Sequence, residues 1–130
     1  MKALRGAVCV IAVLACRDAT GSSGSDVNGQ SEAASRMAGV LRKLVLFEES
    51  YFADSVDYTS DLSFPVPGLH GTNGFEVPTG LRLTLEYVTG GGWRGTVVDD
   101  ASRVRCAIYI GEGPPVIEDA AEGEPLCEAF

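Results

Sequence analysis

The chain is poor in histidine, in basic residues and in long apolar runs. It has 130 residues with one His, one Trp, 10 Lys and Arg against 18 Asp and Glu, and a formal net charge of −8. Nucleic-acid binding needs a basic surface that neutralises phosphates, and an anionic lipid surface would repel this chain for the same reason. A single His leaves little material for His-based catalysis or a transition-metal site. The length fits one domain, and the composition favours a non-catalytic module over an enzyme.

The first residues have the pattern of an export signal. Lys2 and Arg5 precede an uninterrupted apolar run over residues 6–15. A basic start followed by about ten apolar residues is typical of a secretory signal, whereas a membrane span needs about 20. We therefore predict a signal peptide over residues 1–15, whose removal would take Cys9 with it.

The apolar run stops abruptly at a cysteine. The sequence Val13-Leu14-Ala15-Cys16 resembles the lipobox of bacterial lipoproteins, in which the Cys after the cleavage site receives diacylglycerol. The resemblance implies lipidation at Cys16, and the alternative is ordinary signal cleavage beside a chance cysteine. Arg17 and Asp18 favour the outer membrane over the inner one. Residues 16–30 are rich in Gly, Ser, Asn and Asp, so we expect a flexible tether there.

A helical pattern begins at Ser31 and continues to Asp54. Apolar side chains recur there at alternating steps of four and three, at Ala33, Met37, Val40, Leu44, Phe47 and Tyr51. This spacing places them on one face of an α-helix. A second row widens that face, with Ala34, Leu41, Val45 and Phe52. Gly39 lies inside this predicted helix, where Gly costs about 1 kcal/mol relative to Ala. We interpret its presence as the mark of a close approach between the helix and a neighbouring element.

Three strands follow, over residues 80–88, 93–99 and 103–110. Apolar side chains alternate with polar ones in each, as in strands buried on one face. Short turns between alternating strands predict an antiparallel meander. The helix and the sheet are each apolar on one side, so they should cover each other. We predict an α+β domain over residues 31–130, with one amphipathic helix on a three- to four-stranded sheet.

Two cysteines remain in the predicted domain once Cys9 is removed and Cys16 is lipidated. They are Cys106 and Cys127, and an even pair in an exported protein predicts a disulfide. The alternative is two free thiols. The bridge would close the C-terminal loop of the domain.

In this order the parts resemble the soluble domain of type IV pilins and type II secretion pseudopilins. The segments that carry the resemblance are Leu41–Leu44, Glu48–Asp54, Tyr58–Leu62, Gly92-Trp93 and Cys106–Ile110, and Cys106 with Cys127 matches the pair that bounds the disulfide region of many pilins. The resemblance implies a pilin-like fold. Pilins begin with a long hydrophobic helix that packs the filament core. Here a lipobox and a polar segment stand in its place.

Few side chains in the sequence suggest a catalytic or metal-binding role. His70 lies in a predicted loop without a Ser or Cys neighbour, so we assign it no catalytic role. The acidic pairs Asp99-Asp100 and Glu118-Asp119 offer oxygen ligands for Ca²⁺, but their spacing is not that of an EF-hand. We therefore expect no catalytic residues and no cofactor, and we keep these four acids as weak calcium candidates.

The sequence predicts a lipid-anchored protein of the bacterial cell envelope, with its domain in the periplasm or at the cell surface. We expect a non-catalytic structural or interaction module whose partner is an envelope, pilus or secretion component. One alternative is a lipoprotein that binds a small ligand or Ca²⁺. A second alternative is a minor pilin-type filament subunit.

Overall fold

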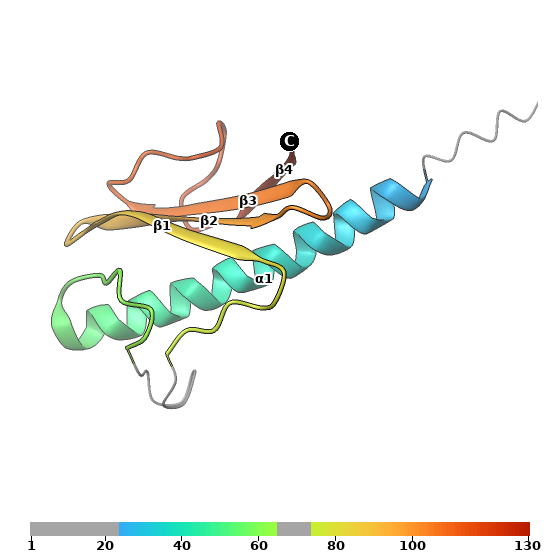
Figure 1. Ribbon diagram of the computed structural model, residues 1–130. Coiled ribbons are helices and arrows are strands. Elements are labelled where there is room, and N and C mark those ends of the chain that lie inside the picture. Colours follow the sequence, from blue (N-terminus) through green and yellow to red (C-terminus); the bar gives the residue numbers. More distant parts are fainter. Residues whose placement is uncertain (1–23, 65–73) are drawn as a thin grey trace, which may run out of the picture.

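The computed structural model describes residues 24–64 and 74–130. It contains one helix and one four-stranded antiparallel sheet, which confirms the predicted α+β class (Figure 1). The strands are hydrogen-bonded in sequence order, as a meander. The elements are α1 (Gly24–Ser55), β1 (Arg82–Thr89), β2 (Gly92–Asp99), β3 (Val104–Gly111) and β4 (Leu126–Ala129). Among the described residues, no helix is long and apolar enough to cross a membrane.

Helix α1 buries the predicted face against the sheet. The buried side chains are Ala33, Met37, Val40, Leu41, Leu44 and Phe47. Tyr51, the last residue of the predicted stripe, is half-buried. The helix ends at Ser55, where the amide of Val56 donates to the carbonyl of Phe52 at 2.8 Å. The periodicity of the sequence therefore identified both the buried face and the end of the helix.

The predicted start of the helix at Ser31 is wrong. Helix α1 begins at Gly24, so residues 24–30 of the expected flexible tether are helical. Adding residues to an existing helix costs far less than nucleating one, so a polar segment can extend it. This end also lies near β4, because Gln30 lines a small pocket together with Cys127, and the carbonyl oxygen of Ala34 is 3.6 Å from the Cys127 sulfur. Residues 16–23 of the predicted tether lie outside the described part.

The sheet presents one row of side chains to the helix across all four strands. Pairing places Leu83 beside Val97, Val97 beside Cys106 and Cys106 beside Cys127. Cys106 and Cys127 form the predicted disulfide. Their sulfur atoms lie 3.7 and 3.6 Å from the carbonyl oxygen of Ala34. The bridge therefore joins neighbouring strands directly beneath the helix.

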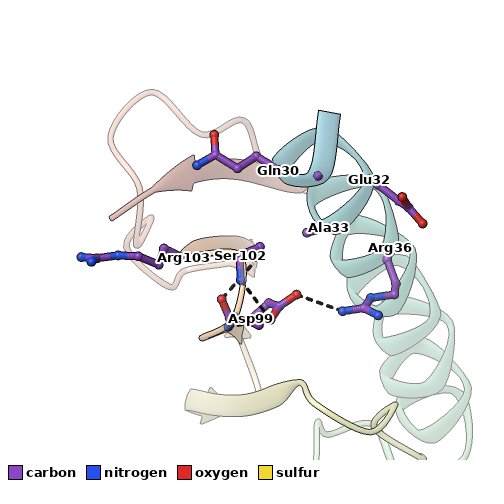
Figure 2. Close-up of a pocket in the computed structure, with 9 residues that line it drawn as sticks. Gln30, Glu32, Ala33, Arg36, Asp99, Ser102 and Arg103 are labelled. Carbon is purple, nitrogen blue, oxygen red and sulfur yellow. Dashed lines mark hydrogen bonds and ion pairs between the residues drawn. The ribbon is translucent and has the colours of Figure 1, made fainter. Parts of the chain in front are cut away.

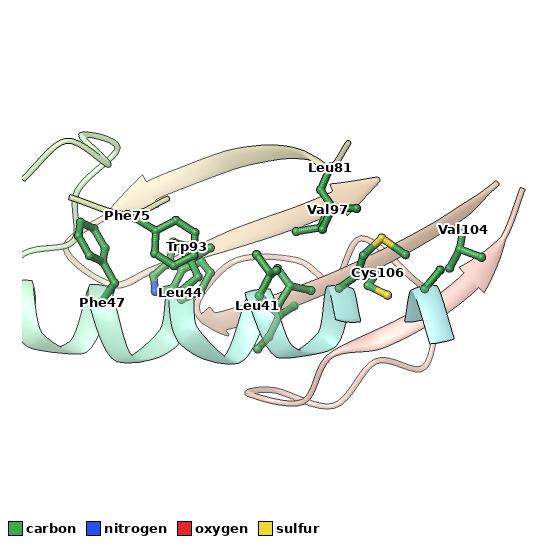
Figure 3. Close-up of a cluster of buried hydrophobic side chains, with 13 residues drawn as sticks. Leu41, Leu44, Phe47, Phe75, Leu81, Trp93, Val97, Val104 and Cys106 are labelled. Carbon is green, nitrogen blue, oxygen red and sulfur yellow. The ribbon is translucent and has the colours of Figure 1, made fainter. Parts of the chain in front are cut away.

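The core reaches from the disulfide to an aromatic group near the end of α1 (Figure 3). Trp93 is fully buried there, and the rings of Phe47 and Phe75 meet edge to face at 5.7 Å. The close approach of helix and sheet occurs at Gly95, where a Cβ atom would lie 3.1 Å from Leu44 and 3.3 Å from Trp93. A Cβ atom on Gly39 would meet nothing within 4 Å, so our interpretation of Gly39 is wrong.

The C-terminal loop lies on the opposite face of the sheet. In Figure 1 the segment between β3 and β4 stands on the side away from α1. Ala107, which faces this side, is buried, and so is Ile117 in the loop. The amide of Gly123 donates to the carbonyl of Tyr109 at 3.0 Å. The disulfide and this hydrogen bond hold the loop close to the sheet.

Candidate functional site

A groove lies between the N-terminal half of α1 and the turn that joins β2 to β3 (Figure 2). Its cavity volume is about 470 Å³. Both acidic and basic side chains contribute to its walls, together with small and polar ones. The lining residues are Gly29, Gln30, Glu32, Ala33, Arg36, Asp99, Ala101, Ser102 and Arg103.

An ion pair crosses the groove. A guanidinium nitrogen of Arg36 lies 2.9 Å from a carboxylate oxygen of Asp99. Asp99 also accepts hydrogen bonds from the amides of Ala101, at 3.0 Å, and Ser102, at 3.4 Å. Burial acts to raise the pKa of Asp99, but these hydrogen bonds and the charge of Arg36 outweigh it and the pKa is lowered. The ionised Asp99 therefore shapes the turn and ties it to the helix.

Arg103 supplies a second cation at the mouth of the groove. Its backbone has φ of 55°, a left-handed conformation that is uncommon for residues other than Gly. Its Nε atom donates to the backbone carbonyl of Phe130 at 3.0 Å. In Figure 2 the side chain of Arg103 extends away from Arg36. The groove therefore offers mixed charge to a small ligand rather than one concentrated charge.

The four calcium candidates do not converge in the described structure. Asp99 is engaged by Arg36, and Asp100 forms an ion pair with Arg82 at 2.8 Å. Glu118 and Asp119 lie in the loop between β3 and β4. Within residues 24–64 and 74–130, no three Asp, Glu, His or Cys side chains are arranged to hold a metal ion. Cys9, Cys16 and His70 lie outside the described residues.

Glu48 is a buried acid that the sequence analysis missed. It is fully buried on α1, and the amide of Thr59 donates to its Oε2 atom at 3.0 Å. Within the described chain, its Oε1 atom and the Nε1 atom of Trp93 are buried without a hydrogen-bond partner. Burial raises the pKa of Glu48 to about 7, the Thr59 hydrogen bond opposes this, and nearby Glu49 adds to it.

The signal for this burial was present in the spacing. Glu48 follows Leu41 by seven residues and Leu44 by four, which places it on the same side of the helix as both. The second apolar row therefore continues through Glu48. A carboxyl in such a row is the kind of residue whose protonation state changes the stability of a fold.

Comparisons of the chain with protein-family models, with curated proteins and with solved structures found no match.

Proposed function

We propose that the chain is a lipid-anchored protein of the bacterial cell envelope, and that its pilin-like domain is a non-catalytic interaction module for a pilus or type II secretion component. The main support for this proposal is the position of α1 between the segment after Cys16 and the sheet. The helix follows the segment after Cys16 and packs on a four-stranded meander whose last strand is disulfide-bonded to the third. A domain that is attached to a membrane by a lipid and built on one long helix is suited to presenting a binding surface to a partner protein.

The disulfide supports an exported location, because such bonds persist in oxidising compartments. Cys106 and Cys127 are 21 positions apart, and closing a loop of about that length contributes roughly 3 kcal/mol on the chain-entropy model. Small domains have limited cores, so this contribution is a large part of their stability. The minor-pilin alternative requires a hydrophobic assembly helix, and the resemblance begins only after the place where that helix would stand.

The membrane anchor is tested by mass measurement. The full chain and its Cys16→Ser variant are expressed in a bacterium with the signal intact, and their intact masses are measured in membrane and periplasmic fractions. We expect acyl chains on the wild-type protein in the membrane and none on the variant. Unacylated wild-type protein would contradict the anchor.

The partner class is tested by crosslinking the full chain in its native cells. We expect a pilus or type II secretion component among the crosslinked products. Recovery of only unrelated envelope proteins would count against this partner class, and it would leave the anchor standing.

The groove beside Arg36 and Asp99 favours a second function, the binding of a small zwitterionic ligand. A ligand that binds only the folded state raises the melting temperature. The full chain is therefore melted with added free amino acids and, separately, with Ca²⁺ or Mg²⁺. Stabilisation that the Arg36→Met variant loses would place an amino acid in the groove. Stabilisation by Ca²⁺ alone would favour the calcium alternative, and no shift would contradict both.

A further inference from the structure

The end of α1 and the loop after it carry an uncompensated negative charge. Between Lys43 and Arg82 the sequence has six acids and no Lys or Arg. Four of these acids, Glu49, Asp54, Asp57 and Asp61, are exposed around the end of the helix. Among the described residues, none of the four ion pairs includes any of them. This end of the protein therefore has a charge that another molecule could neutralise.

Aromatic and aliphatic side chains lie between these acids. The rings of Tyr51 and Phe64 meet at 4.8 Å, and those of Phe52 and Tyr58 also meet at 4.8 Å. None of these four rings is fully buried. Val56 is the most exposed large apolar side chain among the described residues, at 76%. We call this surface, formed by the four rings, Val56 and the four exposed acids, the acidic–aromatic end.

The two parts of the surface touch each other at Tyr58. Its hydroxyl donates to Glu49 at 3.2 Å. Burial raises the pKa of Tyr58, and the charges of Glu49, Glu48 and Glu122 raise it further. The negative charge is therefore spread over apolar surface rather than separated from it.

Two residues of this surface, Asp54 and Val56, occupy positions at which they reduce the stability of the fold. Asp54 lies in the last turn of α1, which has no basic residue, although the helix dipole favours cations at a C-terminus. Val56 has φ of 56°, a left-handed conformation that Gly or Asn adopts with less strain than a β-branched residue. Violations of local rules tend to occur where a surface has another role. Both residues are exposed, so the core does not require them.

The acidic–aromatic end lies at the opposite end of α1 from its first residue, Gly24. Helix α1 has 32 residues, which corresponds to about 48 Å at 1.5 Å per residue. Cys16 precedes its first residue, whereas the acidic–aromatic end surrounds its last turn (Figure 1). The whole length of α1 therefore separates this end from the residue at which the described chain begins.

We propose that the acidic–aromatic end docks a basic amphipathic segment of a partner protein, in which Lys or Arg alternate with bulky apolar side chains. The proposal rests on the proposed function, because it names the partner chemistry of the interaction module. A second copy of the chain would bring the same acids together, and an anionic lipid surface would be repelled. A basic segment neutralises the acids while its apolar side chains cover Val56 and the rings.

The test uses the full chain in neutral detergent micelles, titrated by calorimetry with a short synthetic peptide of alternating Lys and Leu. A Glu and Leu peptide is the charge control, and empty micelles are the blank. We expect the basic peptide to bind and the acidic one not to bind. Binding of both, or of neither, would overturn the proposal.

Two variants then locate the binding. Asp54→Lys and Val56→Asn should each weaken binding, by roughly tenfold for the lost charge attraction or apolar contact. Both should raise the melting temperature, because Lys suits the helix C-terminus and Asn suits the left-handed conformation. This combination of higher stability and weaker binding separates a docking role from a structural one.

The matched control is Glu118→Lys, which makes the same charge change in the exposed C-terminal loop. It should leave the affinity within about twofold, because Glu118 is not part of the acidic–aromatic end and is not among the acids that raise the pKa of Tyr58. An equal loss in Glu118→Lys and Asp54→Lys would mean that only net charge matters, which would overturn the proposal. Failure of the anchor would appear as a missing acyl mass on Cys16, with peptide binding unchanged.

Discussion

Below a pH of about 7 the folded protein holds a proton on Glu48, because burial raises the pKa of this carboxyl from its ordinary value of 4.5 to about 7. In the unfolded chain the same carboxyl titrates near the ordinary value. Between these two pH values the folded state therefore binds one proton more than the unfolded state. Its free energy of unfolding must fall as the pH rises through this window.

The size of this fall follows from the difference between the two pKa values. Each unit corresponds to about 1.4 kcal/mol, so Glu48 should cost the folded state about 3 kcal/mol between about pH 4.5 and pH 7, with no further loss above. The direction is opposite to that of an ion-paired carboxylate, which gains stability as it ionises. Glu48→Gln should remove this pH dependence, because an amide is neutral throughout and its oxygen still accepts from the Thr59 amide.

The measurement is denaturant unfolding of the wild-type chain and of Glu48→Gln at several pH values from about 5 to about 8. The curve of the variant should be flatter, and at the alkaline end the variant should be the more stable protein. Glu32→Gln is the matched control, because Glu32 is an exposed glutamate on the same helix, 16 positions before Glu48, and does not act on the pKa of Glu48. Curves that run parallel for wild type and Glu48→Gln would refute the reasoning.

Three further changes test the packing by chemical denaturation. Gly39→Ala should stabilise the protein by about 1 kcal/mol, since its Cβ atom meets nothing within 4 Å; a loss of stability would contradict this. Gly95→Ala should destabilise it by about 1–3 kcal/mol, because Leu44 and Trp93 must move, and an unchanged midpoint would contradict the close approach. Cys127→Ser should cost roughly 3 kcal/mol, whereas unaltered stability under oxidising conditions would show that the bridge contributes little.

The buried faces of the fold could be predicted because periodicity alone encodes them. A helix repeats every 3.6 residues and a strand every two, so apolar spacing reveals which side chains face the core. Met37 and Leu44 on α1 are buried as predicted. The disulfide could also be predicted, because removal of Cys9 and lipidation of Cys16 would leave a single pair.

The start of α1 could not be predicted, because it depends on a contact that local sequence does not encode. Residues 24–30 contain Gly and Asn, which favour turns in isolation. They are helical in the presence of an established helix and of β4, whose Cys127 contacts the carbonyl of Ala34 and lines a small pocket with Gln30. The groove is likewise a product of tertiary structure, since Arg36 and Asp99 are 63 positions apart.

Three departures from local rules occur within nine residues of one another, at the end of α1. Glu48 buries a carboxyl, Asp54 puts negative charge at a helix C-terminus, and Val56 holds a β-branched side chain in a left-handed conformation. The first is connected to the other two through the loop, because the Glu48 carboxyl accepts from Thr59, next to the Tyr58 ring of the acidic–aromatic end. Such departures each reduce stability, so their concentration at one end is easier to explain by a surface role than by folding. The exposed acids and the partly exposed rings beside these departures are therefore the structural reason to look for a basic partner at the end of α1.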